Sequence, residues 1–226
     1  MAKIDIYQAM ATLRAVRRLR PEPLPDEVLA RVIEAATWAP TGGNAQPWRV
    51  IAVSEAEIKE RLAGLYAERW SAYAAHHRTL IEDAPARAKE KARRMLAAGD
   101  YLATHFAETP VVLVFCFDPR RMAITDAELG RVSVVGGASV YPAVQNLLLA
   151  CRAEGLGCVL TTLLCQVEPQ VRELLHIPEP WATAAAIPVG WPVLAGHGPV
   201  SRRPVAKMAF AERWGEPWTM PGESSS

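Results

Sequence analysis

The chain has 226 residues, of which 50% are hydrophobic and 22% charged, and its formal net charge is +1. This composition is typical of a globular protein with a substantial core, and it excludes a disordered or fibrous chain. A near-neutral chain has no overall field that attracts nucleic acid or anionic lipid. We therefore expect no nucleic acid and no membrane as partners, and any anion site must be built locally.

Two helices and one strand are expected in the first quarter of the chain. Asp5 is placed to cap the first helix, and Asp26 and Glu27 suit the positive N-terminal end of the second. Three prolines between these helices predict an extended segment, because each disfavours helix at the residue before it. The expected ranges are 6–13 for the first helix, 26 to just before Pro40 for the second, 41–47 for a loop and 48–53 for the strand.

The middle of the chain predicts a long helical region followed by a buried strand. Ser54 and Glu57 form an S-x-x-E pattern that predicts a capping box at the start of a helix. Residues 66–108 continue as helix with an interruption at Pro85, and we interpret them as a lid or inserted helical region. The uninterrupted apolar run over 111–117 is typical of a buried strand.

The last third of the chain alternates between helix and strand signals. Pro142 suits the first turn of a helix and Gly155 suits its C-terminal end, while Pro188 predicts an edge position or a bulge for its strand. The expected ranges are 139–154, 167–175 and 203–214 for helices, and 156–162 and 182–189 for strands. With about four strands separated by helices, the order indicates an α+β or α/β layer architecture. We expect one domain over 1–215 and a flexible tail over 216–226.

Several kinds of site are disfavoured. There is no G-x-G-x-x-G after a strand, no Walker loop, no H-E-x-x-H and no G-x-S-x-G, which argues against hydrolases and metalloenzymes. The cysteines form no C-x-x-C pair, so we expect small buried hydrophobes in a reducing compartment and no metal site. With no signal-peptide pattern and no run of 18 apolar residues, we expect a cytoplasmic protein. The four cysteines are Cys116, Cys151, Cys158 and Cys165.

Two basic clusters lie near opposite ends of the chain. A phosphate monoester favours bidentate guanidinium partners, so the two clusters together suit one phosphate. The alternative is a solvated basic surface, which we favour for Arg18 and Arg20. The clusters are Arg14, Arg17, Arg18 and Arg20, and Arg202, Arg203 and Lys207.

The loop from Pro40 to Trp48 is the most specific feature. Its two glycines allow close approach of the backbone to a flat ligand. Asn44 and Gln46 offer paired donors and acceptors that suit the edge of a heterocycle. A simple turn before a strand explains these residues equally well.

Five short segments and one C-terminal tripeptide, in their order along the chain, resemble the FMN-dependent nitroreductase family. The resemblance implies an α+β, three-layer fold with a central mixed sheet of four to five strands flanked by helices. It also implies a homodimer with FMN at the subunit interface, NADH or NADPH as hydride donor, and a small electron-poor aromatic acceptor such as a nitroaromatic or quinone. The segments cover residues 14–18, 39–48, 141–150, 155–157 and 161–162, with Arg202-Arg203-Pro204.

The resemblance also assigns site residues. Arg14 and Arg17 match two basic positions of the family's N-terminal motif, whereas Leu13 and Ala15 depart from it. Arg203, with Arg202 beside it, matches the phosphate-binding arginine. The loop residues that match the segment reaching the partner's flavin are Pro40, Thr41, Gly42, Asn44 and Gln46, and those that match the strand end beside the flavin N5 are Thr161, Thr162 and Leu163.

A ping-pong mechanism follows as a hypothesis. Arg17 stabilises negative charge at the flavin N1 and C2=O, and a backbone N–H of Thr162 or Leu163 points at N5. Trp70 and Tyr73 either stack on the acceptor or pack between helices, and we favour packing. The alternatives are a reductive dehalogenase or flavin-destroying relative, and a flavin-binding protein without turnover.

Overall fold

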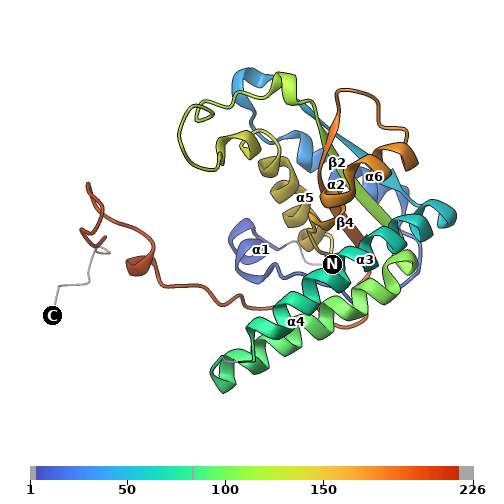
Figure 1. The fold of residues 1–226 in the computed structure, drawn as a ribbon, viewed down its shortest axis with the longest axis horizontal. Coiled ribbons are helices and arrows are strands. Elements are labelled where there is room, and N and C mark those ends of the chain that lie inside the picture. Colours follow the sequence, from blue (N-terminus) through green and yellow to red (C-terminus); the bar gives the residue numbers. More distant parts are fainter. Residues whose placement is uncertain (1–3, 83, 219–226) are drawn as a thin grey trace.

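A four-stranded sheet lies between two helical layers in this computed structural model, which describes residues 4–82 and 84–218 (Figure 1). The order of the strands is β1-β2-β4-β3. The α+β class and the flanking helices are confirmed. The strands are β1 (Trp48–Val53), β2 (Val111–Phe117), β3 (Gly157–Cys158) and β4 (Ala182–Gly190).

All pairings between these strands are antiparallel, so the expectation of a mixed sheet is wrong for the part of the chain described. The connections explain this result. Two antiparallel helices, one running back and one forward, lie between β1 and β2. The chain therefore enters β2 from the end at which it left β1, and the two strands run in opposite directions. One helix lies between β2 and β3, which would suit a parallel pair, but β4 lies between these two strands and runs against both.

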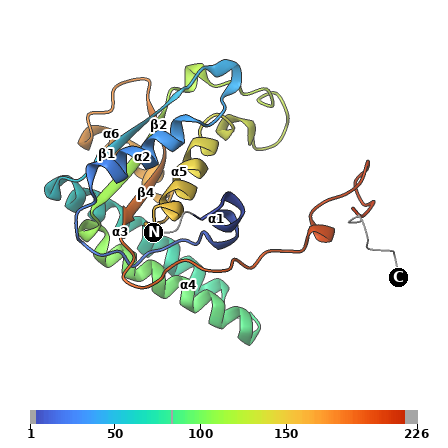
Figure 2. The same cartoon turned by 180° about the vertical axis from the view of Figure 1, so that it is seen from behind.

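The helices cover the two faces of the sheet unequally. Helices α2 and α5 pack on one face, and α3, α4 and α6 pack on the other (Figures 1 and 2). Alternate residues of β2 point to opposite faces: Leu113 and Phe115 enter the core under α2 and α5, whereas Val112 and Val114 enter the core under α3 and α4. The helices are α1 (Ile6–Thr12), α2 (Asp26–Thr37), α3 (Ala56–Leu80), α4 (Ala86–His105), α5 (Tyr141–Ala153) and α6 (Glu168–Leu174).

Helices α3 and α4 form an antiparallel hairpin. Pro85 precedes α4 as its N-cap, and the Tyr66 and Phe106 rings stack with their centroids 4.7 Å apart. Both rings are buried in the core beneath the hairpin. The predicted capping box is wrong, because α3 begins at Ala56 with Glu55 as its N-cap and without a side-chain cap hydrogen bond.

The C-terminal elements differ most from expectation. The predicted strand over 156–162 is reduced to the two residues of β3 and an isolated bridge between Thr161 and Ala186. Strand β4 lies inside the sheet although it contains Pro188, which is opposite Val112. The predicted helix over 203–214 is a single short turn at Val205–Lys207.

The chain after about residue 200 leaves the body of the protein as an extended arm (Figures 1 and 2). We call residues 201–218 the arm. The division into one domain over 1–215 and a tail stays a prediction, and residues 219–226 of that tail lie outside the described residues.

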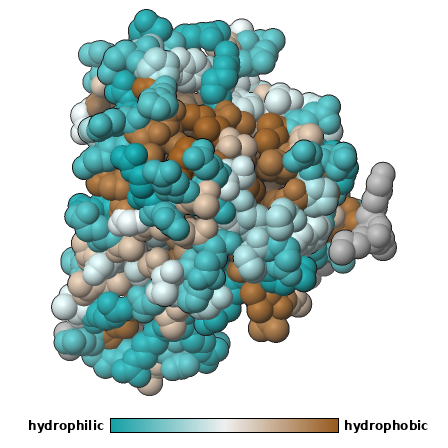
Figure 3. All heavy atoms as spheres, turned by 90° about the vertical axis from the view of Figure 1, so that its right-hand side faces the viewer, coloured by the Kyte–Doolittle hydropathy of each residue, from teal (hydrophilic) through white to brown (hydrophobic). Residues whose placement is uncertain are grey.

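No helix in the described part of the chain is both long and apolar enough to cross a membrane. On one face, apolar side chains gather in a band between polar regions (Figure 3).

Candidate active site

An extended segment beside the sheet edge positions Arg17. The Val16 N–H donates to the Cys158 carbonyl oxygen at 2.9 Å, and the Arg20 N–H donates to the Trp191 carbonyl oxygen at 2.7 Å. A Cβ on Gly157 would lie 2.7 Å from side-chain carbons of Val16 and Leu19. The glycine therefore allows the Arg17 segment to lie directly against β3.

Arg17 lines a cavity of about 200 Å³ together with residues from α3, α4 and the chain after β3. The structure thus brings together six residues that the sequence named as site residues. They are Arg17, Trp70, Tyr73, Thr161, Thr162 and Leu163. We call this space the Arg17 cavity; Tyr66, Met95, Val159 and Leu160 complete its lining.

The backbone after β3 is held by hydrogen bonds that leave the Thr162 N–H free. Thr161 exchanges two 2.9 Å backbone hydrogen bonds with Ala186 of β4. The Leu163 N–H donates to the Thr161 Oγ1 at 3.3 Å. Within the described residues the exposed Thr162 N–H has no hydrogen-bond partner. Of the two predicted backbone donors, Thr162 is therefore the one available to a ligand.

The positive charge in the Arg17 cavity also has no partner among the described residues. Arg17 is half-buried and forms no hydrogen bond or ion pair with any other described residue. Burial raises the pKa of Tyr66 to about 12, although Arg17 and a hydrogen bond with Thr161 act in the opposite direction. Tyr66 is therefore protonated at neutral pH. The cavity accordingly presents a guanidinium, a hydroxyl and a free backbone N–H.

A second cavity of about 410 Å³ shares Thr162 with the Arg17 cavity. No charged side chain lines it, and its polar groups are hydroxyls and the Cys165 thiol, whose pKa burial raises. We call it the apolar cavity. Sequence patterns did not predict this cavity, because residues 118–135 have no clear periodicity. Its apolar walls include Phe117, Met122, Ile124, Val140 and the Tyr141 ring.

The glycine-rich loop after α2 has an unusual backbone. Gly43, Asn44 and Gln46 have φ values of 57°, 53° and 45°, in the left-handed region that side chains other than Asn and Asp rarely adopt. The Gln46 Nε2 donates to the Asn44 Oδ1 at 3.0 Å, and the Gly42 N–H donates to the Ser139 Oγ at 3.2 Å. None of the predicted loop residues lines the Arg17 cavity of the same chain.

Among the described residues, the two basic clusters share no hydrogen-bond or ion-pair partner. The Arg14 guanidinium donates through its Nε and Nη2 to the Pro199 carbonyl oxygen. Arg202 and Arg203 are exposed on the arm, and within the described residues no side chain forms an ion pair with either of them. Arg18 stacks over Tyr101 and Arg20 pairs with Glu22, as surface residues do.

A family model described as the nitroreductase family matches residues 11–191, which is most of the chain. The chain belongs to the nitroreductase family. The expectation of an FMN-dependent NAD(P)H oxidoreductase is confirmed at the level of this family.

Three similar proteins show the breadth of the nitroreductase family around this chain. A 5,6-dimethylbenzimidazole synthase of Rhodospirillum rubrum is 32% identical over 191 residues, which cover 79% of this chain and 78% of the relative. An NADH dehydrogenase of Thermus thermophilus is 29% identical over 214 residues, which cover 92% and 96%. The structure of oxidized iodotyrosine deiodinase bound to FMN and 3-iodo-L-tyrosine shares the fold with a TM-score of 0.64 and 24% identity, covering 93% of this chain and 99% of that one.

The side chains of types that can bind metal are scattered over the described part of the chain. Among residues 4–82 and 84–218, no three His, Cys, Asp or Glu side chains are grouped so that they could hold a metal ion. All four cysteines are free, and three of them are buried. Cys116, Cys151 and Cys158 are buried in the two cores as the sequence predicted, whereas Cys165 is half-buried and lines the apolar cavity.

Proposed function

We propose that this nitroreductase-family protein transfers hydride from NADH or NADPH, through bound FMN, to a small electron-poor acceptor such as a nitroaromatic or a quinone. The observation that carries the proposal is that the unpaired Arg17 and the free Thr162 N–H line one cavity. Both groups are suited to a ligand that gains electrons and negative charge on reduction.

The two cavities at Thr162 fit the two ends of an isoalloxazine ring. The pyrimidine end carries two carbonyl groups and an N–H, and it suits the cavity that holds Arg17 and the Tyr66 hydroxyl. The dimethylbenzene end suits the apolar cavity, which no charged side chain lines. Thr162 belongs to both linings, so its N–H would face the middle of the ring system, where N5 lies.

The protein contributes position and charge to the proposed reaction. FMN supplies the hydride chemistry when it is bound. The Arg17 guanidinium would stabilise negative charge near N1 and C2=O, in a site that already holds this cation without a partner. The Thr162 N–H would orient the N5 edge. No side-chain acid or base is required in this proposal. Donor and acceptor would take turns at the one flavin.

We propose that the phosphate end of this site requires a second copy of the chain. An apolar face with a cavity of about 390 Å³ lies between α1, α2 and α5. Its exposed side chains include Ile6, Trp38 (72% exposed), and the neighbouring Tyr7 and Met10. A homodimer through this face would cover them, and the loop with Asn44 and Gln46 would then reach the partner's cofactor.

The arm supports the same proposal. It leaves the body with its large apolar side chains exposed, among them Met208 and Trp214 (91% exposed). Exposed apolar side chains on an extended segment are stabilised when they pack on another surface. An arm packed on a partner would also fix Arg202 and Arg203, which would then bind the phosphate together with Arg14.

The first experiment is an absorbance spectrum of the purified full chain. A bound flavin spectrum that is lost on anaerobic addition of NADH or NADPH, and restored by a quinone or nitroaromatic, is the expected result. A preparation that binds no FMN when FMN is supplied would disprove the proposal. A yellow protein that neither nicotinamide cofactor reduces would identify a flavin-binding protein without turnover.

The similarity to a 5,6-dimethylbenzimidazole synthase and to iodotyrosine deiodinases keeps a specialised reaction as the second candidate. Product analysis separates these reactions. Release of iodide from 3-iodotyrosine, or formation of 5,6-dimethylbenzimidazole under oxygen, in place of quinone or nitroaromatic turnover would favour the specialised reaction.

A further inference from the structure

Trp70 forms one wall of the Arg17 cavity and rests directly on α4. Its side chain is only 7% exposed. A Cβ built on Gly99 of α4 would lie 2.0 Å from the Trp70 Cη2 and Cζ2 atoms. Glycine inside a helix destabilises it relative to alanine. The backbone at Gly99 is helical and needs no glycine, so the glycine provides space for the indole ring.

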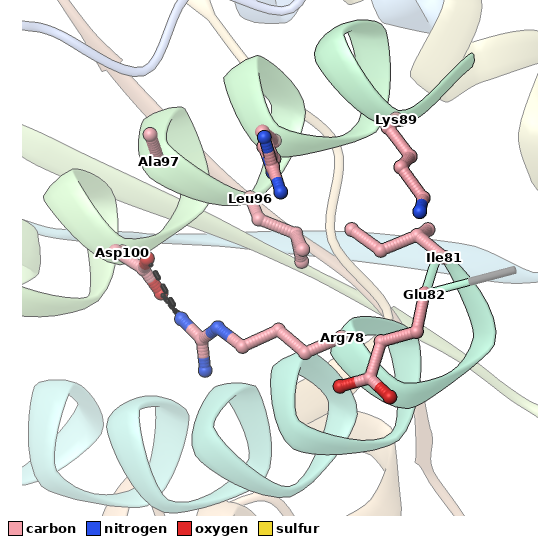
Figure 4. A pocket seen from close by; sticks show the side chains of 8 residues that line it. Arg78, Ile81, Glu82, Lys89, Leu96, Ala97 and Asp100 are labelled. Carbon is pink, nitrogen blue, oxygen red and sulfur yellow. Dashed lines mark hydrogen bonds and ion pairs between the residues drawn. The ribbon is translucent and has the colours of Figure 1, made fainter. Parts of the chain in front are cut away.

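The next residue of α4 fixes the rotation of the same indole. The Trp70 Nε1–H donates to the Asp100 Oδ1 at 2.8 Å. The Arg78 Nη2 donates to both oxygens of the same carboxylate at 2.9 Å, and Figure 4 shows Arg78 extending from α3 towards Asp100 on α4. The Asp100 and Arg78 side chains are 45% and 51% exposed. An ion pair this exposed contributes little to stability, so its consequence is mainly the orientation of the carboxylate.

The third consecutive residue of α4 contacts the neighbour of Arg17 in the chain. The Arg18 guanidinium lies over the Tyr101 ring, 4.0 Å from its centroid. Arg18 follows Arg17 directly, so Tyr101 holds the segment that carries the cavity's cation. Gly99, Asp100 and Tyr101 therefore connect α4 to two walls of the Arg17 cavity, although none of the three lines it.

We propose that Asp100 is a positioning residue which, together with Gly99, holds the Trp70 indole as a rigid wall of the Arg17 cavity. Gly99 and Asp100 of α4 would thereby set the width of the cofactor site without lining it. The inference rests on the proposed function in one respect, namely that the occupant of the cavity is the FMN ring system.

A set of four variants separates positioning from stability. Asp100→Leu removes the acceptor for the indole, and Gly99→Ala pushes the ring from its place. Asp100→Asn keeps an acceptor oxygen and loses the ion pair, and Arg78→Gln loses the ion pair alone. We expect the first two to weaken FMN binding about 10-fold, the effect of losing one good hydrogen bond or contact. The last two should weaken it less than about 2-fold.

The position of the Trp70 indole can be measured by NMR in the absence of any cofactor. The chain has seven tryptophans, and a ¹⁵N–¹H spectrum of the apoprotein resolves their indole N–H signals, with Trp70→Phe assigning the one of interest. We expect the Trp70 signal to shift and to exchange faster with water in Asp100→Leu and Gly99→Ala. It should keep its position and slow exchange in Asp100→Asn and Arg78→Gln.

Two outcomes would overturn the inference. One is an unchanged Trp70 signal in both Asp100→Leu and Gly99→Ala. The other is an Arg78→Gln variant that loses FMN as strongly as Asp100→Leu, since the exposed ion pair would then be the important contact. A wild-type protein that fails to bind FMN would instead disprove the proposed function, and the indole spectra would still decide how Trp70 is held.

Discussion

The two ends of the proposed cofactor site are built very differently. The ring end, around Arg17 and Thr162, is assembled within one chain by packing of α3, α4 and the sheet edge. The phosphate end has Arg14 bonded to a backbone carbonyl and Arg203 exposed on the arm. Packing of α3 and α4 against the sheet edge positions the ring end, whereas we propose that a second copy of the chain completes the phosphate end.

The comparison is tested most severely by removing the second chain. Trp38→Glu places a charge on the apolar face between α1, α2 and α5, and we expect a monomer by light scattering. FMN affinity should fall about 1,000-fold, equivalent to about 4 kcal/mol, because the phosphate end is lost. Leu80→Glu, at an equally exposed site at the end of α3, is the matched control and should leave the assembly intact. A wild-type monomer that holds FMN tightly would contradict the comparison.

Removal of one phosphate contact has the next largest effect. Arg203→Ala should weaken FMN binding about 100-fold, because a charge-assisted hydrogen-bonded pair contributes about 1.5–3 kcal/mol. Riboflavin binding, which involves no phosphate, should not change. Arg213→Ala on the same arm is the control. Equal loss of FMN and riboflavin in Arg203→Ala would remove Arg203 from the phosphate end.

At the ring end, Arg17→Ala should slow reduction of bound flavin by NADH or NADPH on the order of 10- to 100-fold, because charge developing on the ring is no longer compensated. FMN affinity should change much less. Arg20→Ala, whose guanidinium pairs with Glu22 instead, serves as the control in stopped-flow measurements. A variant that releases FMN but reduces the remaining flavin at the normal rate would reverse the roles of the two ends.

The smallest expected effect concerns His197, just before the arm. Its Nε2 lies 2.8 Å from the Leu156 carbonyl oxygen, and its Nδ1 lies 3.4 Å from the Arg14 backbone N–H. Burial lowers the pKa of His197 below its usual value. The unfolded chain therefore binds the extra proton first, and this contribution to stability is complete above about pH 6.5 and is lost as the pH falls below it.

We accordingly expect the melting temperature of His197→Gln to fall less between pH 7.5 and 5.5 than that of the wild type. Parallel thermal melts across this range measure the difference. Identical slopes for the two proteins would show that His197 does not titrate in this range.

The sequence predicted some elements closely and others poorly, for identifiable reasons. The predicted strands over 48–53 and 111–117 are confirmed. Short runs of apolar and β-branched residues are typical of strands whose side chains are buried in a sheet. Asp5 caps α1 as predicted, through its hydrogen bond with the Gln8 N–H. The capping box at Ser54 and the helix over 203–214 failed, because such local patterns form only when the surrounding packing favours them.

Within the candidate site, residue types were easier to predict than their arrangement. Arg17, Thr161 and Thr162 came from short motifs, and the structure brings them to one cavity. The free state of the Thr162 N–H depends on hydrogen bonds that Thr161 and Leu163 make, which no motif records. The support of Trp70 by Gly99 and Asp100 involves residues 29 and 30 positions away in the sequence, beyond the reach of any local pattern.

The sequence by itself determined the family, the α+β class and most of the groups that line the cavity, because these depend on residue identity and local periodicity. Only the tertiary structure decided the antiparallel direction of the strands, the hydrogen bonds of Arg14 with the Pro199 carbonyl oxygen, and that the N–H of Thr162 rather than that of Leu163 stays free. These features depend on distances between segments far apart in the chain, and such distances are set by how the helical layers pack on the sheet.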